Sequence, residues 1–595
     1  MQGIRSGLVA LGVLAVAVVV SVTTASAHIE RASYWPDPAP DTSVNPPAGG
    51  AVPKARGLFS ALRRKPPGKT RVVCQKGSMR RLRGAIRGAR RHGYEVRPSE
   101  EPRKLSARRA KKLRRFNARL KKRCRFRSIQ AAVFRARNND RIVIMPGRYT
   151  EPRSRAQPTN DPRCDDLEVL NDEGSSQALS YAYQVKCPND QNLIAVMGRK
   201  VGPGQDPAEP REDRHGIPNL GACVRCNLQI EGSGVSADDV VIDAGRIESG
   251  DGGPPEPVKD VGIRADRADG FVLRKVKVRH AAEHNIYVLE SDGYRLEHFK
   301  TYYAGEYGVL TFVEDHGLMQ HCDAAGHGDA GLYPGASAET GEQTVEPKRR
   351  YNQEVRFCDM HHNAAGWSGT SGNAVWVHHN NIYDNALGLT TDVFTASGHP
   401  GFPSDSLLIE RNNFYSNNFN PYVDGSDVVP TIPVPVGTGM WIAGGNNMTV
   451  RHNHFWDNWR RGVMLFAVPD ALVCGPAAGG NEQAGCDESK VSTSFRNRFH
   501  DNVMGIDPQG RRDPNGTDFW WDEFSDNTNN CWYRNIGRDG TETSITSVPA
   551  ALPSDCSTSR GMGGPVQQSE LVGCFVAISS DTRNCPWFTT PPEPH

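Results

Sequence analysis

Long apolar segments are scarce in this sequence of 595 residues, and only one stands out. Leu8 to Val22 is an almost entirely apolar run, but it is shorter than the roughly twenty residues that a membrane-spanning helix needs. Arg5 precedes this run, and Ala25-Ser26-Ala27 follows it with the small-x-small pattern of a signal peptidase site. We therefore expect residues 1–27 to be a secretory signal peptide, with an uncleaved N-terminal anchor as the alternative. The mature chain should have no membrane span and be secreted or held in the cell envelope.

The sequence also lacks a cysteine left over from pairing, because the number of cysteines is even. It has fourteen, and most lie near a partner in the sequence, as in disulfide-bonded extracellular proteins. The segment Cys223-Val224-Arg225-Cys226 has the CxxC pattern of some redox and zinc sites. Without a second CxxC it favours a local disulfide. The expected local pairs are Cys74 with Cys124, Cys164 with Cys187, Cys223 with Cys226, Cys474 with Cys486, Cys531 with Cys556, and Cys574 with Cys585.

Acidic residues are almost absent from residues 54–127, which hold 29 Lys and Arg against 3 Asp and Glu. The whole chain has 71 Lys and Arg and 67 Asp and Glu, so the residues outside this segment include 42 basic and 64 acidic ones. Such a segment could bind teichoic acid, another anionic polysaccharide or nucleic acid, or it could lie against the acidic body of its own chain. Export and the lack of interleaved aromatic residues make nucleic acid the least favoured partner.

Composition divides the N-terminal part of the chain. Residues 28–53 are rich in Pro, Ala and Gly and are expected to form an extended linker. The basic segment that follows is predicted to be an α/β arm over residues 54–125. Its apolar residues recur at helical spacing in Met79–Arg91 and Ala107–Arg123, which gives each predicted helix one face to bury.

Residues 128–151 contain a recognisable helix-to-strand unit. Ile129, Ala132 and Val133 lie on one face of a predicted helix, and the strand Arg141–Met145 and Pro146-Gly147 follow. The sequence of this unit resembles the entry segment of pectate-lyase-like and pectin-methylesterase-like β-helices. The resemblance implies that the helix caps the open end of a stack of coils.

Asparagines repeat through the body of the chain with one spacing. Each of four segments has an apolar or small residue three positions before one Asn, an apolar residue two positions after it, and a second Asn five positions after it. Upstream, the same frame passes through Val276, Phe299, Cys322 and Cys358, and the basic step is about 22 residues. The first asparagines are Asn380, Asn412, Asn453 and Asn497, and the second are Asn385, Asn417, Asn458 and Asn502.

Stacked coils explain this spacing. A coil of three short strands cannot bury its inward side chains alone, so coils stack, and equivalent residues lie about 4.8 Å apart. Asparagines at a tight corner can then bond to one another as a ladder. We expect Asn380, Asn412, Asn453 and Asn497 in one column, and a disulfide between Cys322 and Cys358. An all-β sandwich with accidental periodicity is the alternative.

The entry segment and the repeat together resemble the right-handed parallel β-helix repeat family, the pectate-lyase-like superfamily. The resemblance implies an all-β fold with a right-handed parallel β-helix over residues 126–508, a basic α/β N-terminal arm and a disulfide-rich C-terminal cap. Residues 509–595 lose the register and are rich in cysteine and aromatic residues, as expected of a cap that protects the last coil. We expect a monomer.

Three carboxylates share one position in successive frames. Glu283, Glu306 and Asp329 each lie seven residues after the frame position and precede a strand that forms the cleft floor in related folds. They could be a catalytic pair for glycoside hydrolysis or a calcium site, and a solvated acidic edge is the alternative. His327, two residues before Asp329, is the candidate general base.

Aromatic residues at outward positions of the same strands are candidates for stacking on sugar rings. These are Tyr287, Tyr333 and Trp441. Histidines are frequent elsewhere, but no HExxH motif is present, so a transition-metal site is not favoured. No cofactor is therefore assigned, and calcium is the only ion considered.

Family motifs do not name one reaction. Val375-Trp376-Val377-His378-His379 resembles the Val-Trp-Ile-Asp-His pattern of pectate lyases, but His378 stands where that family has Asp. The paired aspartates of pectin methylesterases and the Asn-Thr-Asp motif of polygalacturonases are absent. We therefore expect a polysaccharide-active protein, either a lyase, epimerase or hydrolase acting on an acidic glycan in a groove along the β-helix. A non-catalytic glycan-binding or adhesive envelope protein is the alternative.

Overall fold

The computed structural model describes residues 36–37, 39–63, 67–170, 177–179, 181–200, 221–246, 250, 252–337, 351–370, 372–393, 404–468, 494–525, 527–580 and 584–595. The expected signal peptide lies outside these residues. Within them, no helix combines the length and the apolar character that a membrane crossing requires.

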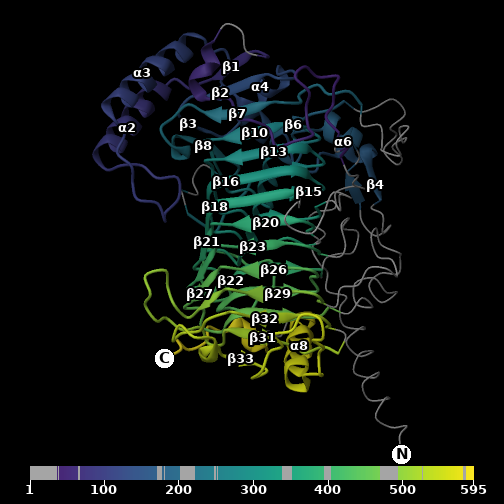
Figure 1. Ribbon diagram of the computed structural model, residues 1–595. Helices are drawn as coiled ribbons and strands as arrows, with labels where there is room; N and C mark the ends of the chain where they lie inside the picture. Colours follow the sequence, from purple (N-terminus) through teal and green to yellow (C-terminus); the bar gives the residue numbers. More distant parts are fainter. Residues whose placement is uncertain are drawn as a thin grey trace, which may run out of the picture.

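The described strands form a parallel β-helix with three faces, as Figure 1 shows along its length. A 20-stranded sheet bends at a corner and supplies two of the faces, and an 11-stranded sheet supplies the third. Equivalent strands of successive coils pair in parallel, for example β12 with β9 and β15. The predicted all-β fold class is therefore confirmed.

The first face runs from the N-terminal end of the stack to the C-terminal end. Its strands are β1 (Thr70–Val73), β2 (Arg141–Ile144), β7 (Gln229–Gly232), β10 (Phe271–Arg274), β13 (Asp292–Glu297), β16 (Asp315–Ala325), β18 (Gln353–His361), β20 (Val375–His378), β23 (Leu408–Glu410), β26 (Thr449–Arg451), β29 (Arg498–His500) and β32 (Cys531–Tyr533).

The long strands β16 and β18 continue around the corner into the second face. The other strands of that face are β3 (Gly147–Tyr149), β8 (Val240–Asp243), β11 (Lys277–Arg279), β14 (Lys300–Tyr302), β21 (Asn381–Tyr383), β24 (Asn413–Tyr415), β27 (His454–Trp456) and β30 (Val503–Met504).

The third face is the one on which the sequence places candidate site residues. Its strands are β6 (Asn192–Met197), β9 (Val261–Asp266), β12 (His284–Leu289), β15 (Tyr307–Phe312), β17 (Ala330–Pro334), β19 (Ala365–Trp367), β22 (Leu387–Asp392), β25 (Thr438–Ala443), β28 (Arg461–Phe466), β31 (Phe519–Trp521) and β33 (Ser547–Val548). Strands therefore stack beyond both predicted limits of the β-helix, residues 126 and 508.

Helices lie mainly at the two ends of the stack. The α-helices are α2 (Ser78–Arg91), α3 (Ala107–Lys122), α4 (Ile129–Phe134), α5 (Pro152–Arg155), α6 (Tyr181–Lys186) and α8 (Pro565–Ser579). The 3-10 helices are η1 (Leu58–Leu62), η2 (Pro162–Leu167), η3 (Ala237–Asp239), η6 (Glu542–Ser544) and η7 (Pro586–Phe588), and β4 (Glu168–Leu170) and β5 (Gln177–Leu179) form an antiparallel pair. Ile129, Ala132 and Val133 of α4 are buried in the same core as the first coils, where the resemblance places a cap.

The basic segment packs on the first strands. Leu82 and Ile86 of α2 and Leu113 and Phe116 of α3 bury their side chains in one cluster with Val143 of β2. The apolar faces that the sequence predicts are thus turned inward, and the arginines and lysines of the same helices point outward. Strand β1, which lies within the predicted arm, belongs to the first face of the β-helix.

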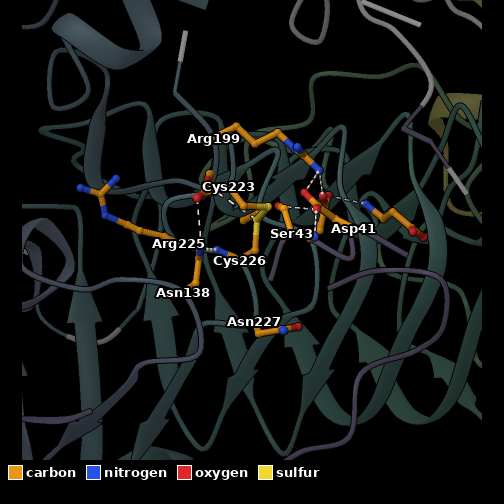
Figure 2. The surroundings of a disulfide bond; sticks show 12 residues. Asp41, Ser43, Asn138, Arg199, Cys223, Arg225, Cys226 and Asn227 are labelled. Atoms are coloured by element: carbon orange, nitrogen blue, oxygen red, sulfur yellow. Dashed lines mark hydrogen bonds and ion pairs between the residues drawn. A yellow bond between two sulfur atoms is a disulfide. The ribbon is translucent and has the colours of Figure 1, made fainter. Parts of the chain in front are cut away.

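The Pro- and Gly-rich segment before the arm lies along the first face. The backbone N–H of Arg56 donates to Gln229 Oε1 over 2.8 Å, and Arg295 Nε donates to Pro53 O over 2.7 Å. Figure 2 shows the N-terminal end of this segment, where Asp41 meets Arg199 (3.2 Å) beside the disulfide of Cys223 and Cys226.

Six of the seven expected cysteine pairs fall within the described residues, and all six are disulfides. Cys322 and Cys358 bridge adjacent coils in register, with a Cα–Cα distance of 4.5 Å. The CxxC segment forms a local disulfide with a Cα–Cα distance of 5.6 Å. The remaining four are Cys74–Cys124, Cys164–Cys187, Cys531–Cys556 and Cys574–Cys585.

The seventh expected pair stays a prediction. Cys474 lies outside the described residues, and so does Cys486. The structure therefore does not test whether Cys486 is bonded to Cys474, and the pairing rests on their closeness in the sequence.

Asparagine ladders line the corners of the coils. Asn380 Nδ2 donates to Asn412 Oδ1 over 3.0 Å, and Asn412 Nδ2 donates to Asn453 Oδ1 over 3.1 Å. A second ladder links Asn385 to Asn417 over 3.0 Å in the same way. Each amide also binds a backbone carbonyl of the previous coil, so buried corner groups are satisfied without solvent.

The prediction that Asn497 is the fourth member of this column is wrong. Asn453 bonds to Asn502, not to Asn497, and Phe499 aligns with Val450. Successive corners lie five residues apart, so an Asn-x4-Asn pair fits either of two neighbouring pairs of corners. Asn497 occupies the corner before the first face, where its side chain accepts from the N–H of Met448. The frame is therefore shifted by one corner in this coil.

We predict that Asn412→Ala will be strongly destabilising. The side chain takes part in four hydrogen bonds at a buried corner, two of them accepted from Asn380 and two donated. Leaving these partners unsatisfied should lower the free energy of unfolding by on the order of 3 kcal/mol. Denaturant titration measures this loss in the free energy of unfolding. The matched control is Asn413→Ala, at the neighbouring half-buried position. Equal losses in the two variants would show that the ladder carries no special stability.

Candidate functional site

The three predicted carboxylates form a column at the entrance to the third face. The backbone N–H of Glu306 donates to Glu283 O over 3.0 Å, and that of Asp329 donates to Glu306 O over 3.0 Å. The N–H of Glu283 likewise donates to Asp260 O over 2.9 Å, so a fourth carboxylate begins the column. Sequence reasoning missed Asp260, although it precedes Glu283 by the same 23 residues that separate the other members.

Burial increases along the column. The Glu283 side chain is 37% exposed and that of Glu306 is 14% exposed, whereas Asp329 is buried. Burial, and then the charge of Asp260, raise the pKa of Glu306 to about 7. Burial also raises the pKa of Asp329 well above its ordinary value, and this carboxyl shares a hydrogen bond with the Tyr307 hydroxyl. Near neutral pH, Glu306 therefore lies close to its midpoint.

His284 lies between two members of the column. Its Nε2 is 3.9 Å from Glu283 Oε2, and its Nδ1 is 3.8 Å from Glu306 Oε2. The ring is buried, with Tyr287 edge-on at 5.2 Å and Tyr307 tilted against it at 5.3 Å. One imidazole thus lies within 4 Å of carboxylates of two adjacent coils, beyond hydrogen-bond distance but close enough for its charge to influence their protonation.

His327 does not lie with the column, and its surroundings do not suit a general base. The ring is buried, its Nδ1 accepts from the N–H of Ala304 over 3.0 Å, and its Nε2 donates to Thr301 O over 3.1 Å. Because Nδ1 must accept a backbone N–H, the ring is held neutral, and burial lowers the pKa of His327 to about 3. We therefore correct the sequence expectation for this residue.

His327 occupies a rung of the second asparagine ladder. Its Nδ1 and Nε2 do what Oδ1 and Nδ2 do in Asn385, which accepts from the N–H of Asn363 and donates to Met360 O. The N–H of His327 donates in turn to Asn363 Oδ1 over 3.0 Å. The signal was present in the sequence, because His327 follows Cys322 by the five residues that separate the paired asparagines.

The predicted sugar-stacking aromatic residues are outward on the third face but buried. Tyr287 packs against the Arg264 guanidinium, whose carbon is 4.8 Å from the ring centroid, and Tyr333 packs on Tyr307 at 4.7 Å. Trp441 meets Trp587 of the C-terminal segment at 5.7 Å. Side chains of this chain thus occupy their surroundings, which corrects the expectation that the three rings form open platforms.

The carboxylate column is not one of the described groups suited to hold a metal ion. Among the described residues, two groups bring three ligand atoms within 4.8 Å of one another. Cys223 and Cys226 with Asp269 are one, but a disulfide removes its thiolates. Asp292, Asp315 and His316 are the other, at the corner between the third and first faces, and there His316 Nδ1 already contacts Asp292 Oδ1 at 2.7 Å.

Comparisons with known proteins agree with the fold. Residues 341–515 match the family model described as "Right handed beta helix region". No curated protein matches the sequence. The predicted resemblance to the right-handed parallel β-helix repeat family is thereby confirmed.

Three matched solved structures share little sequence with this chain and have TM-scores below 0.5. The A-module of an Azotobacter vinelandii mannuronan C-5 epimerase is 11% identical, with a TM-score of 0.36, over 69% of this chain and 90% of that one. A DFA-IIIase from Arthrobacter chlorophenolicus A6 is 14% identical, with a TM-score of 0.37, over 71% and 83%. The pectate lyase Pel9A is 12% identical, with a TM-score of 0.29, over 79% and 78%. At these values the similarity does not identify a reaction.

We predict that Glu306 makes stability depend on pH. Its folded pKa of about 7 lies above its unfolded value, so the folded state holds the extra proton. Stability should therefore fall as pH rises from about 4.5 to about 7, with a slope on the order of 1 kcal/mol per pH unit from this group. Glu306→Gln should remove that slope in denaturant titrations across this range. The exposed Glu101→Gln is the control, and an unchanged slope in Glu306→Gln would contradict the assignment.

We predict that His327→Asn will be tolerated. Asparagine can accept from the Ala304 N–H and donate to Thr301 O, as the other rungs do. The melting temperature should stay within a few degrees of the wild type, whereas His327→Ala, which leaves buried groups unsatisfied, should lower it by about 4 °C or more. Thermal unfolding monitored by circular dichroism measures both. Equal destabilisation by Asn and Ala would exclude the ladder role.

Proposed function

We propose that this right-handed parallel β-helix protein acts on an acidic polysaccharide at the head of the third face, with Glu306 as general acid and Glu283 as general base. The observation that carries the proposal is the contrast between two neighbouring carboxyls. Glu283 is the more exposed, and Glu306 on the next coil has a pKa of about 7. Two carboxyls held in unlike environments are the usual basis of acid and base roles in one site.

The spacing of stacked coils supports the choice of this pair. The backbones of adjacent coils are about 4.8 Å apart, and carboxyl separations of about 5 to 9.5 Å serve retaining and inverting glycoside hydrolysis. The same pair could remove a ring proton and protonate the departing oxygen, as a lyase requires. For an epimerase, one carboxyl would remove the ring proton and a second acid would return a proton to the same carbon from the opposite face. His284, within 4 Å of both carboxyls, would orient them and restore the proton between turnovers.

Protonation also makes the column compatible with an anionic substrate. Four ionised carboxyls in a row would repel a uronate chain. Because burial raises the pKa of Asp329 and that of Glu306 to about 7, the column carries less negative charge near pH 7 than its composition suggests. Asp329, buried and bonded to Tyr307, would position the aromatic neighbours of His284 and would not contact the substrate.

The cysteines support a location outside the cytoplasm. Six disulfides hold the described part of the chain, and such bonds persist in oxidising compartments such as the extracellular space and the cell envelope. A polysaccharide substrate of that compartment is in keeping with this location. A purely aromatic binding groove has less support, because Tyr287, Tyr333 and Trp441 are buried.

We predict that Glu306→Gln and Glu283→Gln will each lower turnover roughly 10²- to 10⁴-fold, because each removes one partner of an acid–base pair. The protein is assayed against polygalacturonate, alginate and a neutral glucan, with and without calcium. Reducing ends, unsaturated products and C-5 inversion by NMR distinguish the three reaction classes. Wild-type activity should also decline as pH rises through about 7, when Glu306 loses its proton.

Asp329→Asn is the matched control in the same column. It keeps the shape of a buried side chain that is not proposed to contact the substrate, so turnover should fall by less than about tenfold. If Glu306→Gln and Asp329→Asn retain the same activity, the acid is elsewhere. If none of the polysaccharides is changed by the wild type but one is bound, the non-catalytic alternative is favoured.

A further inference from the structure

A basic cavity lies between the N-terminal segment and the side of the stack. Its volume is about 700 Å³. Residues 56–63, α3, and the corner that joins β10 to β11 contribute to its walls. Five arginines and one lysine line it, and no carboxylate does; the cations are Arg56, Arg63, Arg103, Arg109, Arg274 and Lys275.

Three of these cations form no close ion pair with a described carboxylate, although the charges of Glu231 and Asp239 act on Lys275 from a greater distance. Within the described part of the chain, no carboxylate lies within 4.0 Å of the charged groups of Arg63, Arg109 or Lys275. The Lys275 ammonium makes one hydrogen bond, to Val235 O at 3.5 Å. By contrast, Arg274 pairs with Glu297 at 3.1 Å.

The fold holds these cations together at an electrostatic cost. Lys275 has a φ of 54°, at the tight corner of its coil, and Phe59 and Leu58 of η1 pack beside α3. Burial, and then the charges of Arg274 and Arg109, lower the pKa of Lys275 to about 8. An anion in the cavity would relieve both the repulsion and the lost hydration of these groups.

We propose that this cavity binds an anionic segment of a polysaccharide through its carboxylate, sulfate or phosphate groups. The cations are spread along a cavity that has room for more than a single small ion, and the exposed basic residues of α3 extend the charge beyond it. The cavity lies at the corner between the first and second faces, whereas the carboxylate column precedes the third face. This site is therefore separate from the proposed acid–base pair.

Phe59 and Tyr94 are among the residues that line the cavity, and the covered ring of Phe59 favours a glycan over a nucleic acid. Single-stranded nucleic acids bind through basic grooves in which bases stack on open aromatic rings. The ring of Phe59 is covered by Lys112, at 4.2 Å from its centroid, and by Arg109 at 4.7 Å, and Phe116 meets it at 5.1 Å. Its faces thus contact this chain's own side chains.

Binding is tested on the full chain with labelled oligogalacturonate, by fluorescence anisotropy at low and at physiological salt. Unlabelled heparin-derived oligosaccharide, inorganic phosphate, a neutral dextran oligosaccharide and single-stranded DNA serve as competitors. Arg109→Gln and Lys275→Met should each weaken oligogalacturonate binding about tenfold, since each removes a charge-assisted contact. The matched control is Arg108→Gln, which removes the same charge from the neighbouring exposed position on α3, outside the cavity.

The competitors decide between sources of the anion. Displacement by heparin fragments but not by dextran supports recognition of charge on a glycan, and phosphate alone displacing the probe at low concentration would identify a phosphate group as the ligand. Equal losses in Arg108→Gln and Arg109→Gln would overturn the proposal in favour of a diffuse surface field, and tighter binding of DNA would overturn it in favour of nucleic acid. No binding of any anionic glycan would also overturn it. Binding that Arg109→Gln weakens and Glu306→Gln does not belongs to the cavity, whereas a loss confined to Glu306→Gln would place the bound glycan at the carboxylate column and overturn the proposal.

Discussion

The parallel stacking of coils at one strand spacing is the constraint on which the rest of this structure depends. Every position in a coil faces the same position in the next, so a side chain must be able to lie beside its own kind. Asparagine does this at the corners, because its amide both donates and accepts. Glycine does it at the start of the third face, where a Cβ on Gly331 would come within 2.8 Å of Gly366 O. Residues that repel their own kind, such as carboxylates, instead need surroundings that change their protonation state.

Much of the fold could be predicted from the sequence because stacking requires equivalent residues to recur at a regular spacing along the chain. The asparagine spacing located the corners, and Cys322 and Cys358 fell in register. The period does not say which corner an Asn-x4-Asn pair occupies, because neighbouring corners are five residues apart. That ambiguity explains why Asn497 was assigned to the wrong corner. The ladder position of His327 was also overlooked, because its ring nitrogens accept and donate where other rungs use an amide. Boundaries were missed where strands such as β1 pair without the asparagine signal.

The candidate site was predictable in position but not in chemistry. A common spacing identified the carboxylate column, yet burial decides what each member does, and burial depends on segments distant in sequence. Trp441 is covered by Trp587 of the C-terminal segment, and Tyr287 by Arg264 of the previous coil. His284 was passed over because its role comes from contact with carboxylates on two coils. A linear pattern contains neither kind of information.

The separation of charge along the chain follows from the same geometry. Stacking leaves the acidic residues of the body in columns, where burial and protonation limit their repulsion. The basic segment instead caps one end, and a few of its residues neutralise the body directly, as Arg71 does with Asp140 at 2.7 Å and Arg97 with Asp359 at 3.3 Å. Its helices bury their apolar faces against the first strands, so the remaining cations must face solvent or the cavity. A surplus of positive charge that the chain does not neutralise itself is most simply explained by an external anion.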